Sequence, residues 1–358
     1  MSRTPCRFVI CRFVMSRWVG AARFVVAHFV VGIGALLLAS CAAPLVPQDA
    51  PSRAEVTAGH YEPIPADKDS DLRLFYSDGR IVTGANALER MRLDADLMLW
   101  LAGNQFFAME DVVRAFQRQH PAVGNVGLIT LPPGVLLNAM QKGGWRYKDK
   151  DYALLPDVYA SVDLGHLKTL RVNGRMNDYM IYLHNALDLM VAKGNPKGIK
   201  GIDDLGRSDV RSMLPNPIDE GIMVFYARKV LIRHGLWDRL SGGRECKSCR
   251  PHPNVYFTAV HHREIPEALK SGTADAGIVW ATETKNALQE GAPVETVPLP
   301  PADSLVDDVS YAIGILTDAK HPAAAQRYLE FMASAAGQDA YARHGFIKAT
   351  DATLKPIP

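Results

Sequence analysis

The fold of this chain is predicted most directly by the stretch Leu97–Trp145, which begins LMLWLAGNQFFAMEDVVRAFQRQHP. An apolar run of strand length, Leu97–Leu101, is followed by a short polar turn and then by apolar residues at helical spacing as far as His120-Pro121. Continuous apolar runs are typical of strands that are buried on both faces. The pattern repeats at once, with Val126–Thr130 as a strand and Val135–Lys142 as a helix. Two consecutive strand–turn–helix units predict an α/β fold in which helices cover a parallel sheet.

The same pattern continues along the chain. Residues 154–161 and 162–170 form a third predicted strand and helix, and Ile222–His234 is predicted as a strong helix. Tyr179–Lys193 is apolar over a length that suits a strand leaving one lobe and entering another. Residues 69–95 are interpreted as an addition that precedes the core sheet. In parallel α/β sheets ligands bind beyond the carboxyl ends of the strands, so the turns after the strands are the expected binding edge.

The first 40 residues have the features of an export signal. Phe24–Leu38 is an apolar run of secretory length that follows Arg17 and Arg23. The small residues before Cys41 resemble the bacterial lipoprotein box, which implies cleavage after Ser40 and acylation of Cys41. The alternative is an uncleaved anchor with an incidental cysteine. A second Met-Ser-Arg at Met15 leaves open where translation starts, and the proline-containing stretch 41–68 is predicted to be a tether.

Composition and charge exclude several classes of protein. The 358 residues are 48% hydrophobic and 22% charged, which suits about two globular domains with full cores. The net charge of +2 becomes −3 without the signal, because the first 40 residues hold five arginines and no acid. A mildly acidic chain argues against binding to nucleic acid.

Three later motifs resemble the type 2 periplasmic solute-binding proteins, in particular their molybdate-binding branch. Pro156–Ser161 is similar to a PDVFxS element, and Gly272–Val279 is similar to a GxADxGIV turn and strand. Ala323–Phe346 resembles the C-terminal helix pair of the family, which ends in Gly-Phe. The motifs occur in the family's order, and the resemblance covers residues 97–348.

The resemblance implies an α/β fold of two lobes, each a mainly parallel sheet flanked by helices, with two crossing strands as the hinge. We expect lobe one at 69–184 and 302–358, lobe two at 185–301, and crossings near 182–191 and 296–304. Ligand is then trapped between the lobes and offered to an ABC permease in the inner membrane. The protein is expected to be a periplasmic monomer, lipid-anchored through Cys41, and to need no cofactor or resident metal.

A small anion, with molybdate or tungstate as the first candidate, is the ligand that the resemblance implies. Helix N-termini at the cleft offer free N–H groups, and neutral polar side chains complete such a site. The candidates follow strands or open helices, and each alone is also explained as a cap or turn residue. They are Asn104, Gln105, Thr130, Ser161, Glu220 and Thr282. The family has a small hydroxyl where Asn104-Gln105 stands, and amides suit a ligand of mixed polarity.

His261-His262-Arg263-Glu264 is a second departure from the family. It follows a predicted strand and opens a helix, so it should face the cleft. Arg263 could pair with an anion in bidentate fashion, and at most one of His261 and His262 is expected to reach the ligand, because neighbours on a strand point to opposite faces. An interlobe hydrogen-bond network is the other interpretation.

Cys246 and Cys249 form a CxxC pair in an exported chain, for which a disulfide is the first expectation. A metal-handling or redox lipoprotein that uses these cysteines with His261 and His262 is the main alternative function. A sensor or adaptor on the same scaffold is another. No nucleophile motif, HExxH, P-loop or GxGxxG occurs, so an enzyme is not expected.

Overall fold

The computed structural model describes residues 61–64 and 68–358. The predicted signal peptide at 1–40, the lipidation site Cys41, the alternative start at Met15 and most of the tether lie outside the described residues. In the part of the chain that is described, no helix is both long and apolar enough to cross a membrane.

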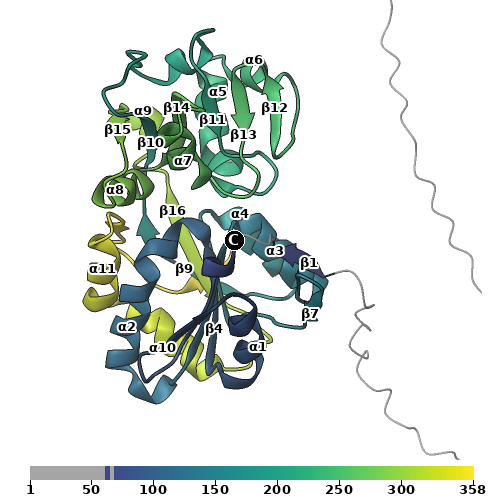
Figure 1. The fold of residues 1–358 in the computed structure, drawn as a ribbon. Coiled ribbons are helices and arrows are strands. Elements are labelled where there is room, and N and C mark those ends of the chain that lie inside the picture. The colour runs from purple at the N-terminus through teal and green to yellow at the C-terminus, as the bar shows by residue number, and fades with distance from the viewer. Residues whose placement is uncertain (1–60, 65–67) are drawn as a thin grey trace, which may run out of the picture. The chain divides into compact units, whose positions relative to one another are not determined.

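Two large sheets, each flanked by helices, build residues 68–358, and a small sheet adjoins the first (Figure 1). We call the nine-stranded sheet with its helices the first lobe, and the six-stranded sheet with its helices the second lobe. The strands of the first lobe are β2 (Leu72–Phe75), β3 (Ile81–Thr83), β4 (Leu97–Ala102), β5 (Val126–Leu131), β8 (Val158–Ser161), β9 (Asp178–His184), β16 (Ser310–Ile315), β17 (Ile347–Lys348) and β18 (Lys355–Pro356). Its helices are α1 (Gly84–Asp94), α2 (Met109–Gln119), α3 (Pro133–Lys142), α4 (Leu164–Val172), α10 (Pro322–Ala333) and α11 (Ala335–Ala342).

The second lobe contains the strands β10 (Leu187–Ala192), β11 (Ser212–Leu214), β12 (Cys249–His252), β13 (Val255–Phe257), β14 (Ala276–Trp280) and β15 (Val294–Val297). Its helices are α5 (Arg228–Arg233), α6 (Trp237–Ser241), α7 (Glu264–Lys270), α8 (Ala281–Gln289) and α9 (Pro301–Ser304). A π-helical turn at Ile222–Ala227 runs directly into α5, so the two form one continuous helix.

The opening stretch folds as predicted. β4 and β5 pair in parallel from Leu97 opposite Val126 to Ala102 opposite Leu131, and every residue of both strands is buried. α2 and α3 follow these strands, and β8 pairs in parallel with the other edge of β4. Burial on both faces explains why these strands are apolar without alternation.

Both sheets are flanked by helices as expected, but their strand pairings are mixed rather than mainly parallel. In the first lobe β4 pairs in parallel with β5 and β8, and β9 runs in the same direction, whereas β2 and β16 run antiparallel to them. The second lobe has two parallel pairs, which join β11 to β13 and to β14. The chain passes between the lobes along β9–β10 and β15–β16, and strands that return from the other lobe run against the βαβ direction.

The interpretation of residues 69–95 as an addition outside the sheet is also wrong. β2 pairs with β5 and so extends the core sheet, and β3 closes a hairpin on its far side. Glu62–Ile64, inside the predicted tether, forms β1 and pairs with β6 (Trp145–Tyr147), which in turn pairs with β7 (Lys150–Tyr152). These pairings bring Asp71, immediately before β2, to the edge of the first lobe that faces the second.

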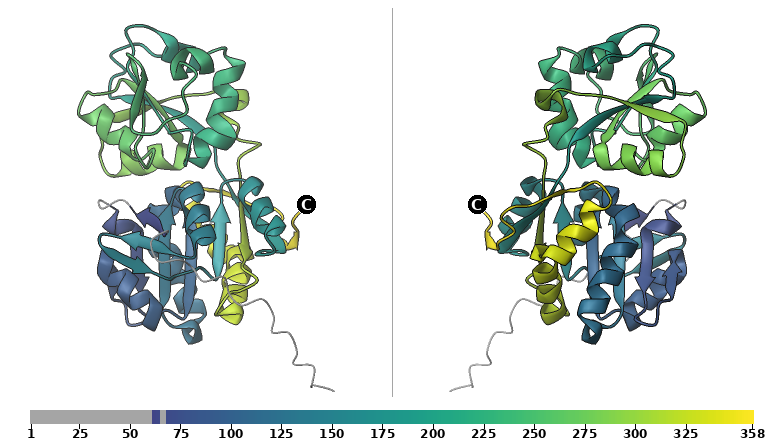
Figure 2. Two further views of the ribbon diagram at one scale, coloured as in Figure 1. Left: turned by 90° about the vertical axis from the view of Figure 1, so that its right-hand side faces the viewer. Right: turned by 90° about the vertical axis from the view of Figure 1, so that its left-hand side faces the viewer.

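Two connections join the sheets, as Figure 2 shows from two sides. The first passes from β9 to β10 through Asn185-Ala186, and the second runs from β15 past α9 to β16. Tyr179–Lys193 is therefore two strands rather than one, interrupted by Asn185. The exact domain limits stay a prediction.

Candidate functional site

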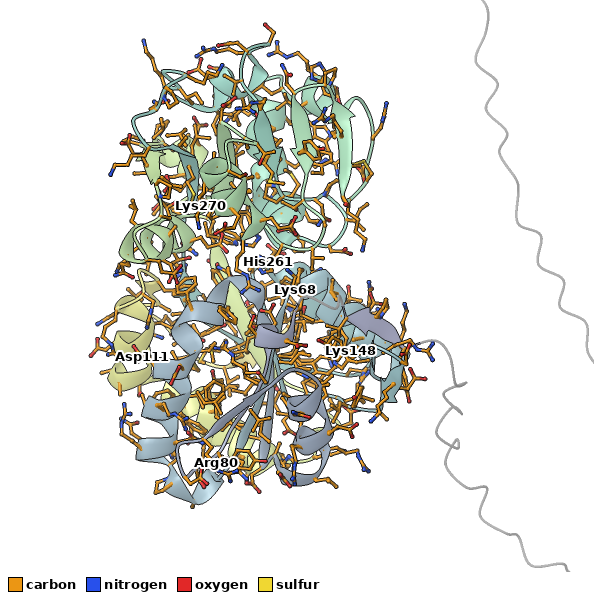
Figure 3. The ribbon with its side chains drawn as sticks, in the orientation of Figure 1. Lys68, Arg80, Asp111, Lys148, His261 and Lys270 are labelled. Atoms are coloured by element: carbon orange, nitrogen blue, oxygen red, sulfur yellow. A yellow bond between two sulfur atoms is a disulfide. The ribbon has the colours of Figure 1, made fainter. Side chains whose placement is uncertain are left out.

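A small cavity of about 10 Å³ lies between the lobes. This is room for about one water molecule. The first lobe contributes the turn after β4, the start of α3 and the end of β8, and the second lobe contributes a helix start and two strand ends. The lining residues are Gly103, Asn104, Pro132, Pro133, Val162, Glu220, Gly221, Ile222, His261, His262 and Trp280. His261 is labelled in Figure 3, where it lies at the junction of the lobes.

Helices from opposite lobes begin at this cavity. α3 begins at Pro133, and the helix of the second lobe begins at Ile222. The two lobes approach each other closely here. A Cβ on Gly134 would lie 3.1 Å from the Asp219 carbonyl oxygen, and a Cβ on Gly221 would lie 2.5 Å from Val162 Cγ2. Helix N-termini carry free N–H groups and a partial positive charge, which favour anions.

A buried triad of charges, Glu220, His262 and Glu283, supports the second-lobe side. Glu220 Oε2 lies 2.5 Å from His262 Nδ1 and accepts the His262 backbone N–H at 2.6 Å. His262 Nε2 lies 2.7 Å from Glu283 Oε1. Burial by itself lowers the pKa of His262, but the carboxylates of Glu283 and Glu220 outweigh it and raise this pKa to about 9. His262 is therefore an imidazolium held between two carboxylates.

His261 is a neutral imidazole whose tautomer is fixed by Arg263. Burial and the neighbouring charge of Arg263 hold the pKa of His261 well below its ordinary value. Its Nδ1 accepts the backbone N–H of Arg263 at 3.2 Å and the Arg263 Nε–H at 3.3 Å. A neutral ring has one proton, so Nε2 carries it. That Nε2 is buried without a hydrogen-bond partner and lies 2.1 Å from where a Gly103 Cβ would be. His261 thus points an N–H donor at the first lobe.

Asn104 joins the cavity to the hinge. Its amide contacts the hydroxyl of Tyr311 on β16, which Asn185 Nδ2 also contacts at 3.0 Å. The same Asn185 nitrogen donates to Thr282 Oγ1 at 3.0 Å. Thr282 was predicted as a ligand residue, but it does not line the cavity and its hydroxyl serves this network.

Two other predicted residues lie inside the first lobe. Gln105 is buried, and its Oε1 accepts the hydroxyls of Tyr182 at 2.8 Å and Tyr341 at 2.6 Å. Ser161 Oγ lies 3.1 Å from His166 Nδ1, a ring whose pKa is lowered to about 4 by burial. Neither residue lines the cavity, so the structure does not group them with Asn104.

Thr130 and Arg263 meet at an ion pair between the lobes rather than at the cavity. Arg263 Nη2 donates to Asp71 Oδ1 at 2.5 Å, and Thr130 Oγ1 donates to the same oxygen at 3.2 Å. The guanidinium also lies 4.6 Å from the ring centre of Phe106. Tyr226 of the second lobe donates to the Val162 carbonyl at 2.5 Å. The structure is therefore a state in which the lobes touch.

The alternative of a metal site fits these residues poorly. Atoms of Glu220, His261 and His262 lie within 4.8 Å of one another. His262 has a carboxylate at each nitrogen, and His261 Nδ1 accepts from Arg263. Both Glu220 oxygens are also occupied, because Oε1 accepts from the Asn216 backbone N–H at 2.9 Å and Oε2 contacts His262. A metal ion would have to displace these partners.

Cys246 and Cys249 form a disulfide, so neither sulfur is a free thiolate. The loop that they close carries Lys247, whose ammonium lies 2.7 Å from Asp219 Oδ2 beside the cavity. This position explains how a loop remote from the hinge supports the start of the second-lobe helix.

Replacement of Cys246 and Cys249 by serine is expected to lower the free energy of unfolding by about 2 kcal/mol, because the bridge closes a loop of only a few residues. Urea denaturation measures the change. Reductant should bring the wild-type protein to the level of the double variant and leave that variant unaffected. Equal stability with and without the bridge would contradict the prediction.

A larger hollow of about 450 Å³ lies elsewhere on the second lobe, around Arg211, Arg250 and Tyr256. Its charged groups are already engaged, since Arg211 pairs with Asp275 at 2.7 Å and Arg250 stacks on Tyr256. We therefore place the site at the interlobe cavity.

The sequence prediction missed Asn185, Tyr311 and Trp280. Asn185 could have been found, since a polar amide interrupts an otherwise apolar run. Tyr311 and Trp280 are aromatic residues of strands, and nothing local separates them from core residues.

Comparisons with known proteins agree with this fold. The mycobacterial molybdate-binding protein ModA (Mycobacterium tuberculosis) is 25% identical over 194 residues, which cover 54% of this chain and 66% of that protein. A sulfate-binding protein of Synechococcus elongatus is 27% identical over 184 residues, or 49% of this chain and 50% of that protein. The chain thus matches from half to just under two thirds of the length of these relatives.

A solved structure, the periplasmic molybdate-binding protein of Azotobacter vinelandii, superposes with a TM-score of 0.56 at 17% identity, over 71% of this chain and 100% of that one. At that identity the structural similarity shows only that the two proteins share the two-lobed fold. The model of the bacterial extracellular solute-binding proteins matches residues 97–347, from β4 to β17 and so through both lobes. Because this match covers most of the chain, the chain belongs to the bacterial extracellular solute-binding protein family, in the branch similar to the molybdate-binding proteins.

Proposed function

We propose that this protein is the solute-binding component of an ABC importer and that it captures a small oxyanion of the molybdate or sulfate kind between its lobes. One observation carries the proposal: a fixed N–H donor, His261 Nε2, lies at a cavity where helices of both lobes begin. Helix N-termini and neutral N–H donors can bind an anion without a cationic side chain. The names of the two relatives support an oxyanion as the ligand class.

The ligand-facing residues that we propose are Asn104, His261 and the backbone N–H groups at the starts of α3 and of the Ile222 helix. Glu220 and His262 position this surface. The cavity of about 10 Å³ is smaller than a four-oxygen anion, so binding requires the lobes to separate slightly from the arrangement described. The hinge for that motion lies at Asn185-Ala186 and between β15 and β16.

We further propose that the protein acts as a monomer on the periplasmic side, anchored by lipid on Cys41, and presents its closed form to a permease. The lipoprotein-like sequence before Cys41 supports the anchor. Membrane fractionation tests it, because Cys41→Ala should then release the protein from the membrane fraction.

Thermal-shift measurements on the purified protein test the oxyanion. We expect molybdate, tungstate or sulfate to raise Tm, because a ligand at 100 times its Kd stabilises the folded state by about 2.7 kcal/mol. The shift should survive replacement of both Cys246 and Cys249 by serine and should be lost in His261→Ala. Stabilisation by Zn²⁺ or Cu²⁺ alone, lost in the cysteine variant, would instead favour the metal-handling alternative and refute this proposal.

A further inference from the structure

The hydroxyl of Tyr311 has two amide partners and one proton. In the structure Asn104 Nδ2 and Asn185 Nδ2 both donate to this oxygen. Both nitrogens are donors, so the phenol proton has no acceptor among these partners, and the acceptor Asn104 Oδ1 is buried without a donor. Tyr311, Asn104 and Asn185 are all at most 1% exposed, so bulk solvent does not reach these groups.

Asn185 cannot relieve the mismatch. Its Oδ1 accepts the Ala186 backbone N–H at 2.9 Å, and its Nδ2 also donates to Thr282 Oγ1. Reversal of this amide would place an NH₂ group against the Ala186 N–H. The orientation of Asn185 is therefore fixed, and Asn185 always donates to Tyr311.

Asn104 can relieve the mismatch by a half-turn of its amide. Its Oδ1 then accepts the Tyr311 O–H, and its NH₂ group replaces the unpartnered oxygen. This exchange satisfies the Tyr311 proton and Asn104 Oδ1, each of which costs about 1–3 kcal/mol when it is left unsatisfied. It also takes the amide N–H groups away from Tyr311, so that they need an acceptor, which a ligand in the cavity can supply. The Asn185–Tyr311 pair thus favours the orientation in which Asn104 offers only N–H donors to a ligand.

Several other acceptors around the cavity already accept a hydrogen bond. The Pro133 carbonyl accepts from Tyr159, the Val162 carbonyl from Tyr226, and the Pro132 carbonyl from the Leu136 N–H. Among the side chains that line the cavity, both Glu220 oxygens are occupied by donors of the second lobe.

We propose that Tyr311 and Asn185 are specificity-determining positioning residues, which hold Asn104 as a donor so that the site selects oxyanions without a proton over protonated ones. This inference rests on the proposed function. A fully deprotonated anion such as sulfate or molybdate accepts from Asn104 and from His261 Nε2. A protonated anion such as hydrogen phosphate needs an acceptor, which Asn104 supplies only by turning back and stranding the Tyr311 proton.

Calorimetric titration of the purified protein with molybdate, sulfate and phosphate at neutral pH tests the inference. The wild-type protein should bind molybdate or sulfate more tightly than phosphate. Tyr311→Phe removes the hydroxyl that orients Asn104, and we expect it to narrow this preference by about tenfold, which is the effect of one unsatisfied buried group. The matched control is Tyr328→Phe, a change at another fully buried tyrosine of the first lobe that does not line the cavity. It should leave the preference unchanged.

The outcomes separate the two proposals. The positioning role is overturned if Tyr311→Phe lowers the affinity for all oxyanions equally, or if the wild-type protein binds phosphate as tightly as sulfate. Either result leaves the proposed function standing. Failure of the folded wild-type protein to bind any oxyanion overturns both. Circular dichroism of the variants confirms that each is folded.

Discussion

Glu220→Ala is expected to lower the free energy of unfolding by about 3 to 5 kcal/mol, the usual effect of breaking a buried ion pair by removing one partner. The carboxylate is 1% exposed and accepts from His262, Asn216 and Thr258. Its removal leaves these donors buried without a partner and leaves the His262 charge with Glu283 alone. Urea denaturation at pH 7 measures the loss.

Glu267→Ala is the control for this change. Glu267 lies on the same lobe, but its side chain is 74% exposed, and its ion pair with Lys270 is exposed as well. Its replacement should change the stability by less than about 0.5 kcal/mol. A loss below 1 kcal/mol in Glu220→Ala would show that the triad does not hold the second lobe together.

The pH dependence of stability gives an independent check on the triad. His262 has a pKa of about 9 in the folded protein against 6.5 as its ordinary value. A raised pKa means that the folded state binds the proton more tightly, so this stabilisation is complete below pH 6.5 and is lost as the pH rises through 9. The difference corresponds to about 3 kcal/mol. In Glu220→Gln this alkaline loss should be smaller, because one of the two carboxylates that raise the pKa of His262 is absent.

The strands and helices could be predicted because their signals are local. The apolar run at Leu97–Leu101, the turn after it and the helical spacing that follows are set by neighbours in sequence. The direction of β16 could not be predicted in this way, since it depends on where the chain returns from the other lobe. The pairing of β2 with β5 could not be predicted from local signals either, because it joins the strand before α1 to the strand after α2.

The site was predicted in part. Asn104, Glu220, His261 and His262 do line one cavity, as the rule for strand ends indicates. Gln105 is adjacent to Asn104 in sequence, yet the 3₁₀ turn at Gly103–Ala108 directs its side chain to Tyr182 and Tyr341 inside the lobe. The sequence shows that an amide side chain is present. Where that side chain points, and which groups donate and accept its hydrogen bonds, depend on the packing of the folded protein.

Gly103→Ala is expected to lower the affinity for the oxyanion by about ten- to a hundredfold. The added methyl group would lie 2.1 Å from His261 Nε2. The ring cannot easily retreat, because its Nδ1 is held by two N–H groups of Arg263 and the side chain is buried. Overpacking of this kind typically costs 1–3 kcal/mol, and it arises only when the two lobes meet. Calorimetric titration measures the affinity, and small-angle X-ray scattering with ligand measures closure.

Gly201→Ala is the matched control, since a Cβ there has no heavy atom within 4 Å and the backbone is extended. It should leave both affinity and closure unchanged. The double variant Gly103→Ala, His261→Ala removes the collision and should restore closure in scattering, while affinity stays low because the His261 donor is gone. Full affinity in Gly103→Ala would mean that the ligand-bound lobes separate far enough for the added methyl group to fit beside His261. Full affinity in the double variant would mean that His261 acts only by packing, and the two results together distinguish the geometry of closure from the chemistry of binding.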